Sequence, residues 1–191
     1  MHAIQIFLQH GIDVNYCING TSLLLLTLLY NGPNEISDIL LSQGAKIIDD
    51  CQFHLCEMQM MRNKPHNGLT KAIELGFSPL KRNEYGSNYL HSACLHADLN
   101  IVQQLLQSKY KDELLDERNN NKNTPFLCAS KCENIPILEE LLRAGANIND
   151  QNKSGRTALL NLCLAKNEQG FQFVISRNAD VNLAENNGRV K

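Results

Sequence analysis

The chain has 191 residues and a net charge of −2, which excludes the strongly basic balance typical of proteins that bind a nucleic-acid backbone. Its longest apolar run, Leu23 to Leu29 interrupted by Thr27, is too short to span a bilayer and predicts a buried helix. The seven cysteines are an odd set with no secretory leader before them, so we expect reduced thiols in a cytosolic setting.

One phrase recurs along the chain: an amphipathic helix that ends in Gly-Ala or its equivalent, then a short turn that ends in Asn. Its intervals are 33 residues from Gly11 to Gly44, 32 from Gly44 to Gly76 and 33 from Gly145 to Asn178. A fixed period of this size predicts a repeat array, in which each unit packs only on its neighbours. The phrase stands as FLQHGIDVN (7–15), LLSQGAKII (40–48), LLRAGANIN (141–149) and VISRNADVN (174–182).

In chain order, the register predicts one array over residues 1–191, with a helix pair in each complete unit. The first unit is cut, because its apolar spacing is that of a second helix without a first. We therefore expect a fragment or a module of a longer protein. The predicted units are a partial repeat at 1–15, repeats at 16–49, 50–82, 83–118, 119–151 and 152–184, and the start of a cut repeat at 185–191.

Three of these units depart from the common pattern. In the first complete repeat, NGPNE (31–35) lengthens the connection between the two helices. The repeat at 50–82 is the most divergent and is the predicted weak joint of the array; its residues in register are His54, Ala72, Ile73 and Gly76. After Gln107 the phrase is absent and SKYKDELLDER (108–118) is inserted, which we expect to form a longer finger or loop on one face.

The clearest unit is the repeat at 119–151. Thr124 and Pro125 open a helix that should run to about Lys131, because Thr caps the free N–H groups and Pro fits the first turn. A second helix starts near Ile135 and carries an apolar stripe. Gly145 supplies the left-handed residue that ends it.

This unit resembles an ankyrin repeat. The family pattern is a Gly two residues before Thr-Pro-Leu-His, small residues in the first helix, paired Leu in the second, and then Gly-Ala and a turn. Partial matches are NYLHSAC (88–94), IVQQLL (101–106), RTALLNLC (156–163) and GTSLLLL (20–26). The resemblance implies an all-α solenoid of helix-turn-helix units with short β-turn fingers. It also implies a module without catalysis that binds a partner protein through a concave groove.

The cysteines and histidines offer two chemical alternatives, a zinc site and a Cys/His nucleophile. Zinc needs about four converging ligands, and neither Cys128 with Cys132 nor His54 with Cys56 has finger-like spacing. The nucleophile would pair Cys94 or Cys56 with His91 or His54. We expect neither, nor any cofactor or catalytic residue. Cys94, Cys128 and Cys163 occupy positions that need a small packing residue, and in the resemblance the imidazole of His91 bonds to neighbouring turns.

The resemblance also predicts which residues meet a partner: the fingertips and the ends of the first helices. Tyr and Arg most often anchor interfaces, so Tyr85 and Arg156 are the preferred hot spots and Tyr110, on the insertion, is a third. The asparagines in the positions of Asn15, Asn149 and Asn182 are hydroxylated in some such arrays, but we expect them to bond to their own turns. The candidate contacts are Glu84, Tyr85, Ser87, Leu95, His96, Tyr110, Asn120, Asn121, Asn123, Lys131, Lys153, Ser154 and Arg156.

Two functions remain open. The leading hypothesis is a monomeric cytoplasmic scaffold for a partner protein. The irregular, Asn-rich sequence looks like ankyrin proteins of intracellular bacteria, which implies an effector delivered into a host cell. The alternative is a substrate-recruiting or regulatory module of a larger enzyme whose catalytic domain lies outside these residues. No nucleic-acid or membrane partner is expected.

Overall fold

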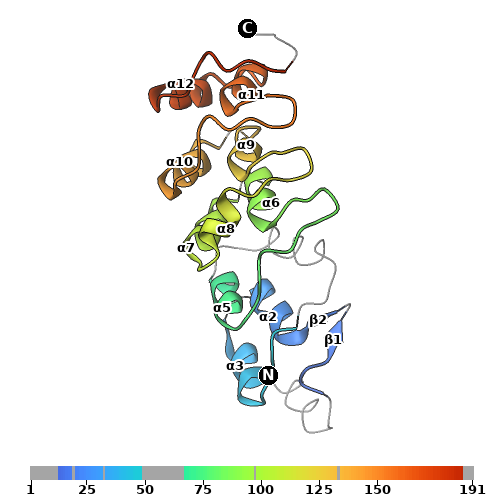
Figure 1. The fold of residues 1–191 in the computed structure, drawn as a ribbon. Coiled ribbons are helices and arrows are strands. Elements are labelled where there is room, and N and C mark those ends of the chain that lie inside the picture. The colour runs from blue at the N-terminus through green and yellow to red at the C-terminus, as the bar shows by residue number, and fades with distance from the viewer. Residues whose placement is uncertain are drawn as a thin grey trace. The chain divides into compact units, whose positions relative to one another are not determined.

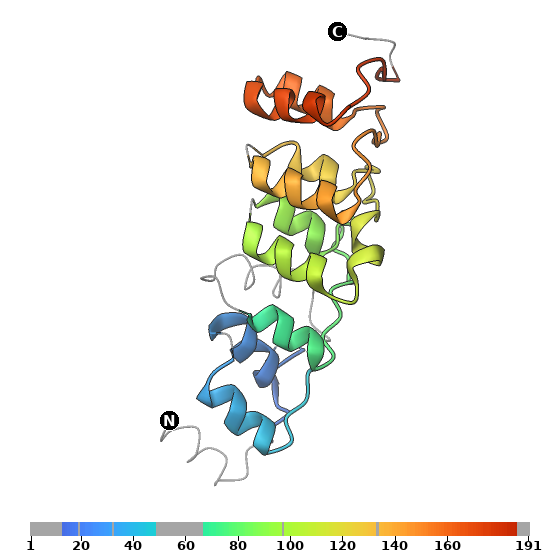
Figure 2. The same cartoon turned by 90° about the vertical axis from the view of Figure 1, so that its left-hand side faces the viewer.

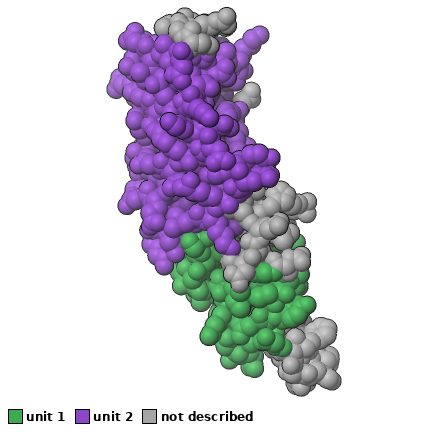
Figure 3. All heavy atoms as spheres, turned by 45° about the vertical axis from the view of Figure 1, so that its right-hand side comes forward, with its two compact units in different colours: residues 1–79 green, residues 80–191 purple. Residues whose placement is uncertain are grey.

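The computed structural model describes residues 13–18, 20–31, 33–48, 67–96, 98–132 and 134–186. The chain forms two compact units, residues 1–79 (unit 1) and residues 80–191 (unit 2), which are coloured in Figure 3.

Unit 1 begins with a small hairpin and continues with helices. Strand β1 (Cys17–Ile18) pairs antiparallel with β2 (Thr21–Ser22), and Gly20 between them has a φ of 79°. The helices are α2 (Leu23–Asn31), α3 (Glu35–Ser42) and α5 (Gly68–Glu74). Leu24, Leu25, Leu28 and Leu29 of α2 are at most 1% exposed, which confirms the predicted buried helix.

One hydrogen bond and two glycines set the register of unit 1. The backbone N–H of Lys46 donates to Asn15 Oδ1 at 2.8 Å, so this asparagine bonds to a residue 31 positions later and not, as expected, to its own turn. Gly44 and Gly76 follow α3 and α5 in left-handed conformation, with φ of 81° and 111°. Residues 49–66 lie outside the described residues, and with them His54 and Cys56.

Unit 2 consists of two layers of helices (Figures 1 and 2). One layer contains α6 (Tyr89–Leu95), α9 (Pro125–Ala129) and α11 (Ala158–Leu164). The other contains α7 (Leu99–Gln107), α10 (Ile135–Ala144) and α12 (Glu168–Ser176). The turns that precede α6, α9 and α11 project away from the α7–α10–α12 layer (Figure 1).

Short polar side chains start the helices of both layers. Thr124 Oγ1 accepts a hydrogen bond from the N–H of Leu127, and Pro125 follows it in the first turn, as predicted. Helix α9 ends at Ala129, two residues before the expected end at Lys131. The equivalent caps are Asn88 and Thr157 in the first layer and Asp98, Asn134 and Asn167 in the second.

Left-handed residues end the second helices where the recurring phrase predicted them. Gly145 has a φ of 109°, and Asn178, 33 positions later, has a φ of 63°. Asn tolerates this region better than most residues that carry a Cβ. Lys122 stands at the slot of Gly86 in the next turn and also has a positive φ, 57°.

The insertion at 108–118 corrects an expectation. It contains a helix, α8 (Lys111–Leu115), that packs against α7 and is not a protruding finger. Leu114 is fully buried and Leu115 is 5% exposed, while Asn88 Nδ2 donates to the Leu114 carbonyl at 3.4 Å. Burying two leucines outweighs the freedom of an open loop, since each contributes about 1.5–3 kcal/mol.

Candidate partner-binding surface

Three turns of identical design carry the predicted fingertips: residues 83–87, 119–123 and 152–156. Each begins with an asparagine, namely Asn83, Asn119 and Asn152. In every turn the Oδ1 atom of this asparagine accepts from the N–H groups two and four residues later, at 2.9–3.1 Å. The first asparagine therefore holds its turn from inside, which is the local chemistry that favours Asn in turns.

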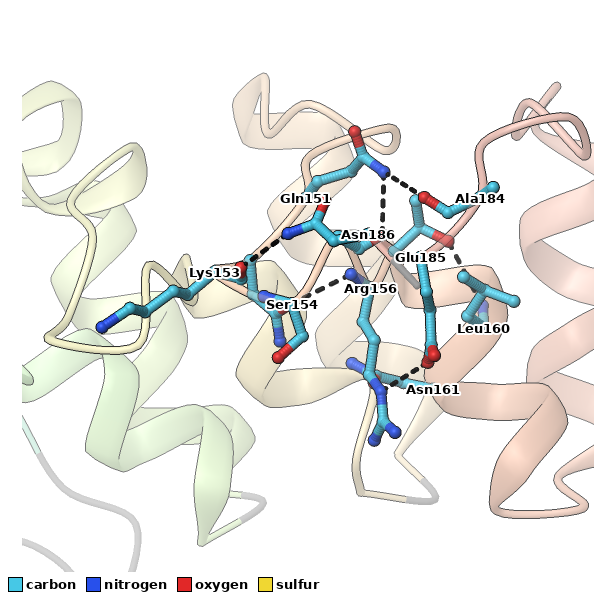
Figure 4. A network of polar contacts seen from close by, with 12 residues as sticks. Gln151, Lys153, Ser154, Arg156, Leu160, Asn161, Ala184, Glu185 and Asn186 are labelled. Atoms are coloured by element: carbon cyan, nitrogen blue, oxygen red, sulfur yellow. Dashed lines mark hydrogen bonds and ion pairs between the residues drawn. The ribbon is translucent and has the colours of Figure 1, made fainter. Parts of the chain in front are cut away.

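Backbone hydrogen bonds join each turn to the next. The N–H of the second residue in one turn donates to the carbonyl of the third residue in the turn before it. The three bonds are Asn120 to Tyr85 at 3.0 Å, Lys153 to Asn121 at 2.9 Å, and Asn186 to Ser154 at 3.0 Å. Glu185 and Asn186 thus continue the same series (Figure 4). The turns form a ladder that holds their exposed side chains in fixed register.

Side chains strengthen this ladder at its base. Asn119 Nδ2 donates to Ser87 Oγ at 3.2 Å, and Asn152 Nδ2 donates to Asn123 Oδ1 at 3.0 Å. At the third junction the polarity is reversed, because Arg156 Nε donates to Glu185 Oε1 at 2.6 Å (Figure 4). The later residue supplies the donor at the first two junctions, and the earlier one supplies it at the third.

These contacts correct two of the predicted partner residues and add a neighbour to a third, Arg156, which remains a prediction. Ser87 and Asn123 are each 4% exposed, so they bond to the next turn and are not accessible to a partner. Arg156 is exposed, but its guanidinium is engaged by Glu185. The sequence showed that these residues lie near fingertips. It did not show which side chain bonds to each of them, because that side chain lies 29 to 32 positions later.

The remaining candidates fall into two accessible groups. Tyr85 is 65% exposed at a turn tip, and Glu84, Asn120, Asn121, Lys153 and Ser154 are exposed on the same turns. Leu95 is 43% exposed at the carboxyl end of α6, next to exposed His96, and Lys131 is exposed just beyond α9. Tyr110 lies apart from both groups: it is half-buried at the start of α8, with Lys109 Nζ 5.1 Å from its ring centre.

Three residues of this face were missed by sequence reasoning. Lys122 is exposed on the middle turn, and Leu164, 48% exposed, and Lys166 lie at the end of α11. The register could have found Leu164, which is 33 positions beyond Lys131. We define the binding surface as the two accessible groups, without Tyr110, together with these three residues.

His91 links the first helix layer to the turns. Its ring is fully buried, and Nε2 lies 2.9 Å from the carbonyl of Asn123, which can only accept. Nδ1 lies 3.3 Å from the backbone N of Asn88 and 2.7 Å from Asn88 Oδ1. Burial lowers the pKa of His91 below its usual value, partly offset by the hydrogen bond to Asn123. The contact to the next turn is the one that the family resemblance implies.

The cysteines of unit 2 include buried and exposed thiols, and Cys132 is half-buried. Burial raises the pKa of Cys94 well above its usual range and that of Cys128 to about 11, so both are inert packing residues. Cys163, expected to pack in the same way, is instead exposed. It borders a pocket of about 200 Å³ together with Leu162, Lys166, Asn167, Glu168 and Phe171.

Among the described residues, no group of three or more His, Cys, Asp or Glu side chains is placed to hold a metal ion. Of the helices described, none is long and apolar enough to cross a membrane.

Stacked helix pairs joined by a ladder of similar turns define a repeat protein. Residues 90–185 match the family of ankyrin repeats (3 copies). The chain therefore belongs to the ankyrin repeat family, whose repeats are modules of protein–protein interaction.

Similar proteins are long proteins of different kinds. The chain is 26% identical over 111 residues to Serine/threonine-protein kinase TNNI3K of Mus musculus, covering 58% of this chain and 13% of that protein. It is 30% identical over 94 residues to Inversin of Danio rerio, covering 49% and 9%. It is 28% identical over 81 residues to the Nuclear factor NF-kappa-B p105 subunit of Gallus gallus, covering 41% and 8%. The matches thus span about a tenth of these relatives.

Proposed function

We propose that the chain is a non-catalytic scaffold that binds a partner protein through the binding surface. The observation that carries the proposal is a set of large apolar side chains held exposed on a hydrogen-bonded framework. Tyr85, Leu95 and Leu164 are 65%, 43% and 48% exposed. Apolar side chains that are pre-positioned lose little entropy on binding, and a Tyr among them is a frequent interface anchor.

The units predicted from the sequence form part of this proposal. Repeats at 83–118, 119–151 and 152–184 each supply one turn and one first helix to the surface. The repeats at 16–49 and 50–82 remain predictions, as does the partial repeat at each end.

Site-specific crosslinking tests the proposal. The full chain is expressed with a photoreactive p-benzoylphenylalanine in place of Tyr85 or, in a second preparation, in place of Leu95. Ile175 on α12 is the matched control, because it is apolar and 37% exposed but lies in the other helix layer. We expect crosslinks to the same protein from positions 85 and 95, and none from 175.

The results can contradict the proposal directly. A partner that crosslinks only from position 175 would place binding on the α7–α10–α12 layer. The Tyr85→Ala/Leu95→Ala variant should lose affinity for the crosslinked partner. If it binds this partner as tightly as the natural chain does, the binding surface is not where the partner binds. Circular dichroism of this variant checks that both helix layers remain folded.

A narrower proposal is that the partner is a host protein and that the chain is a monomeric effector acting in the host cytoplasm. The irregular, Asn-rich sequence supports it, although the turns account for part of that composition because Asn119 and Asn152 hold them. A translocation reporter fused to the chain provides the test. A fusion that stays within the producing cell during infection would overturn this proposal.

A second proposal is that the array targets a larger enzyme to its substrate. The similarity to a protein kinase favours this proposal, since the match covers only 13% of that longer protein. The complete open reading frame and its product test the idea. A product with a catalytic domain, and a substrate whose turnover falls in the Tyr85→Ala/Leu95→Ala variant, would support it; turnover that does not depend on the array would refute it.

A further inference from the structure

The ionic groups beside the turns separate into two kinds. Every arginine there is paired with a carboxylate that lies further along the chain. The pairs are Arg82 with Glu117, Arg118 with Asp150 at 2.7 Å, and Arg156 with Glu185 at 2.6 Å. Arg118 also donates to the carbonyls of Lys122 and Gln151. The arginines therefore connect successive turns, and their charges are largely neutralised within the array.

The lysines of the binding surface behave differently. Lys122 and Lys153 are exposed at turn tips, and Lys131 and Lys166 are exposed beyond the ends of α9 and α11. Each of the four lacks an ion pair with any residue that the structure describes. Glu84 lies on the surface and exposed Glu168 lines the adjoining pocket, so the four lysines stand beside two carboxylates. Asp98 caps α7, and Glu133 lies outside the described residues.

The carboxylates of the opposite helix layer are paired with arginines. Glu139 and Glu140 on α10 accept from Arg143, and Glu139 also accepts from Arg177. The four lysines of the binding surface have no such partner among the described residues. Unpaired charges of one sign steer an oppositely charged partner to the surface that carries them.

The exposed apolar side chains of the surface indicate that the partner also presents apolar side chains. Tyr85, Leu95 and Leu164 are exposed among the lysines, and a pocket of about 200 Å³ opens beside Leu162 and Phe171. The pocket is smaller than the roughly 300–1,000 Å³ usual for small-molecule sites. It has room for a single apolar side chain, and Lys166 at its border can meet a neighbouring carboxylate.

We infer that the partner presents an acidic, extended segment with apolar side chains between its carboxylates; the inference rests on the proposed function. Neighbouring helices pack about 8–10 Å apart, and an extended chain advances about 3.3 Å per residue. Acidic residues about three positions apart therefore match lysines on successive repeats. A nucleic acid fits less well, because the arginines are engaged and Tyr85 and His96 are the two rings that this surface offers for base stacking.

A synthetic peptide tests this chemistry with the full chain. The probe is a fluorescein-labelled peptide of about twelve residues, with Asp at every third position and Leu and Ser between. One control peptide has Asn in place of each Asp, and the other probe is an oligothymidine of the same length. Binding is measured by fluorescence anisotropy at about 50 mM and about 200 mM salt.

Two variants test whether the position of the lysines decides binding. The first changes Lys122, Lys131, Lys153 and Lys166 to Gln. The second changes Lys109 and Lys111, beside and on α8, to Gln and should bind the Asp peptide like the natural chain. We expect the first variant to bind it at least about tenfold more weakly, because four exposed ion pairs contribute modestly but together. We also expect the Asn peptide to bind weakly and the Asp peptide to lose affinity in salt.

The outcomes distinguish the inference from the proposed function. Equal binding of the Asp and Asn peptides, or of the natural chain and the four-lysine variant, would overturn the acidic segment. Tighter binding of oligothymidine than of the Asp peptide would replace it with a nucleic acid. If the crosslinked partner binds through positions 85 and 95 but its affinity depends on neither the four lysines nor salt, the proposed function stands and the inference fails.

Discussion

Gly86 in the first turn provides the sharpest test of the turn ladder. Its φ is +72°, and a Cβ at this position would lie 2.4 Å from Asn120 Oδ1 and 3.0 Å from Asn120 N. Asn120 is the residue that joins this turn to the next, through bonds of 3.0 Å from its N–H to Tyr85 and from its side chain to Glu84. Gly86→Ala should therefore strain one turn and loosen its contact with the following one.

The magnitude follows from these two effects. A left-handed residue with a Cβ costs about 1–2 kcal/mol, and loss of the Asn120 side-chain hydrogen bond costs about 0.5–1.5 kcal/mol. We therefore expect Gly86→Ala to lower the free energy of unfolding by about 1.5–3.5 kcal/mol. The matched control is Lys122→Ala, because Lys122 occupies the same slot with φ of 57° and already carries a Cβ. Its cost should stay within about 0.5 kcal/mol.

Urea unfolding followed by circular dichroism measures both variants. A double-mutant cycle with Asn120→Ala isolates the contact, because the Ala side chain lacks the Oδ1 atom that a Cβ at position 86 would meet. Gly86→Ala should then cost about 0.5–1.5 kcal/mol less in the Asn120→Ala background than in the natural chain. Equal costs for Gly86→Ala and Lys122→Ala, or strict additivity in the cycle, would refute the reasoning.

Three further predictions concern pH, thiols and an ion pair. Burial holds the pKa of His91 below its usual value near 6.5, so its contribution to stability is complete above about pH 6.5 and is lost as pH falls through the folded pKa. Urea unfolding should therefore give a lower free energy of unfolding at about pH 5.5 than at about pH 7.5, and His91→Gln should reduce this difference. A difference that His91→Gln leaves unchanged would contradict the prediction. Iodoacetamide should modify Cys163 in the folded chain and Cys94 only after unfolding, which peptide mass spectrometry resolves; similar rates would argue against their different burial. Arg156→Ala should cost about 0.2–1 kcal/mol in thermal unfolding, and exchanging the charges of Arg156 and Glu185 should recover part of it; a swap that recovers nothing would rule out the pair as the cause.

Local signals in the sequence determined the helix ends and the turns. Gly145 and Asn178 end their helices in left-handed conformation at the predicted interval, and Thr124 caps α9 as expected. These features depend on the φ preference of one residue or on a hydrogen bond within three residues. The resemblance similarly predicted that His91 reaches a neighbouring turn, which its bond to Asn123 confirms. Such preferences act within a short stretch of chain, so they can be read without the fold.

Only the tertiary structure decided what the repeated positions contact. Ser87, Asn123 and Arg156 occupy one slot in three turns, yet two are buried and the third is ion-paired. Their contacts are made with Asn119, Asn152 and Glu185, which lie 29 to 32 residues further along the chain. The sequence alone does not state which donor or acceptor the neighbouring repeat presents.

Burial was likewise settled by packing between elements. The stretch at 108–118 has the composition of a loop, but Leu114 and Leu115 become buried once α8 packs on α7. Cys163 has the register of a packing residue, but it is exposed. Periodicity predicts where a residue stands in its own repeat. Whether that residue is core or surface depends on what lies against it, and this is determined by the stacking of repeats.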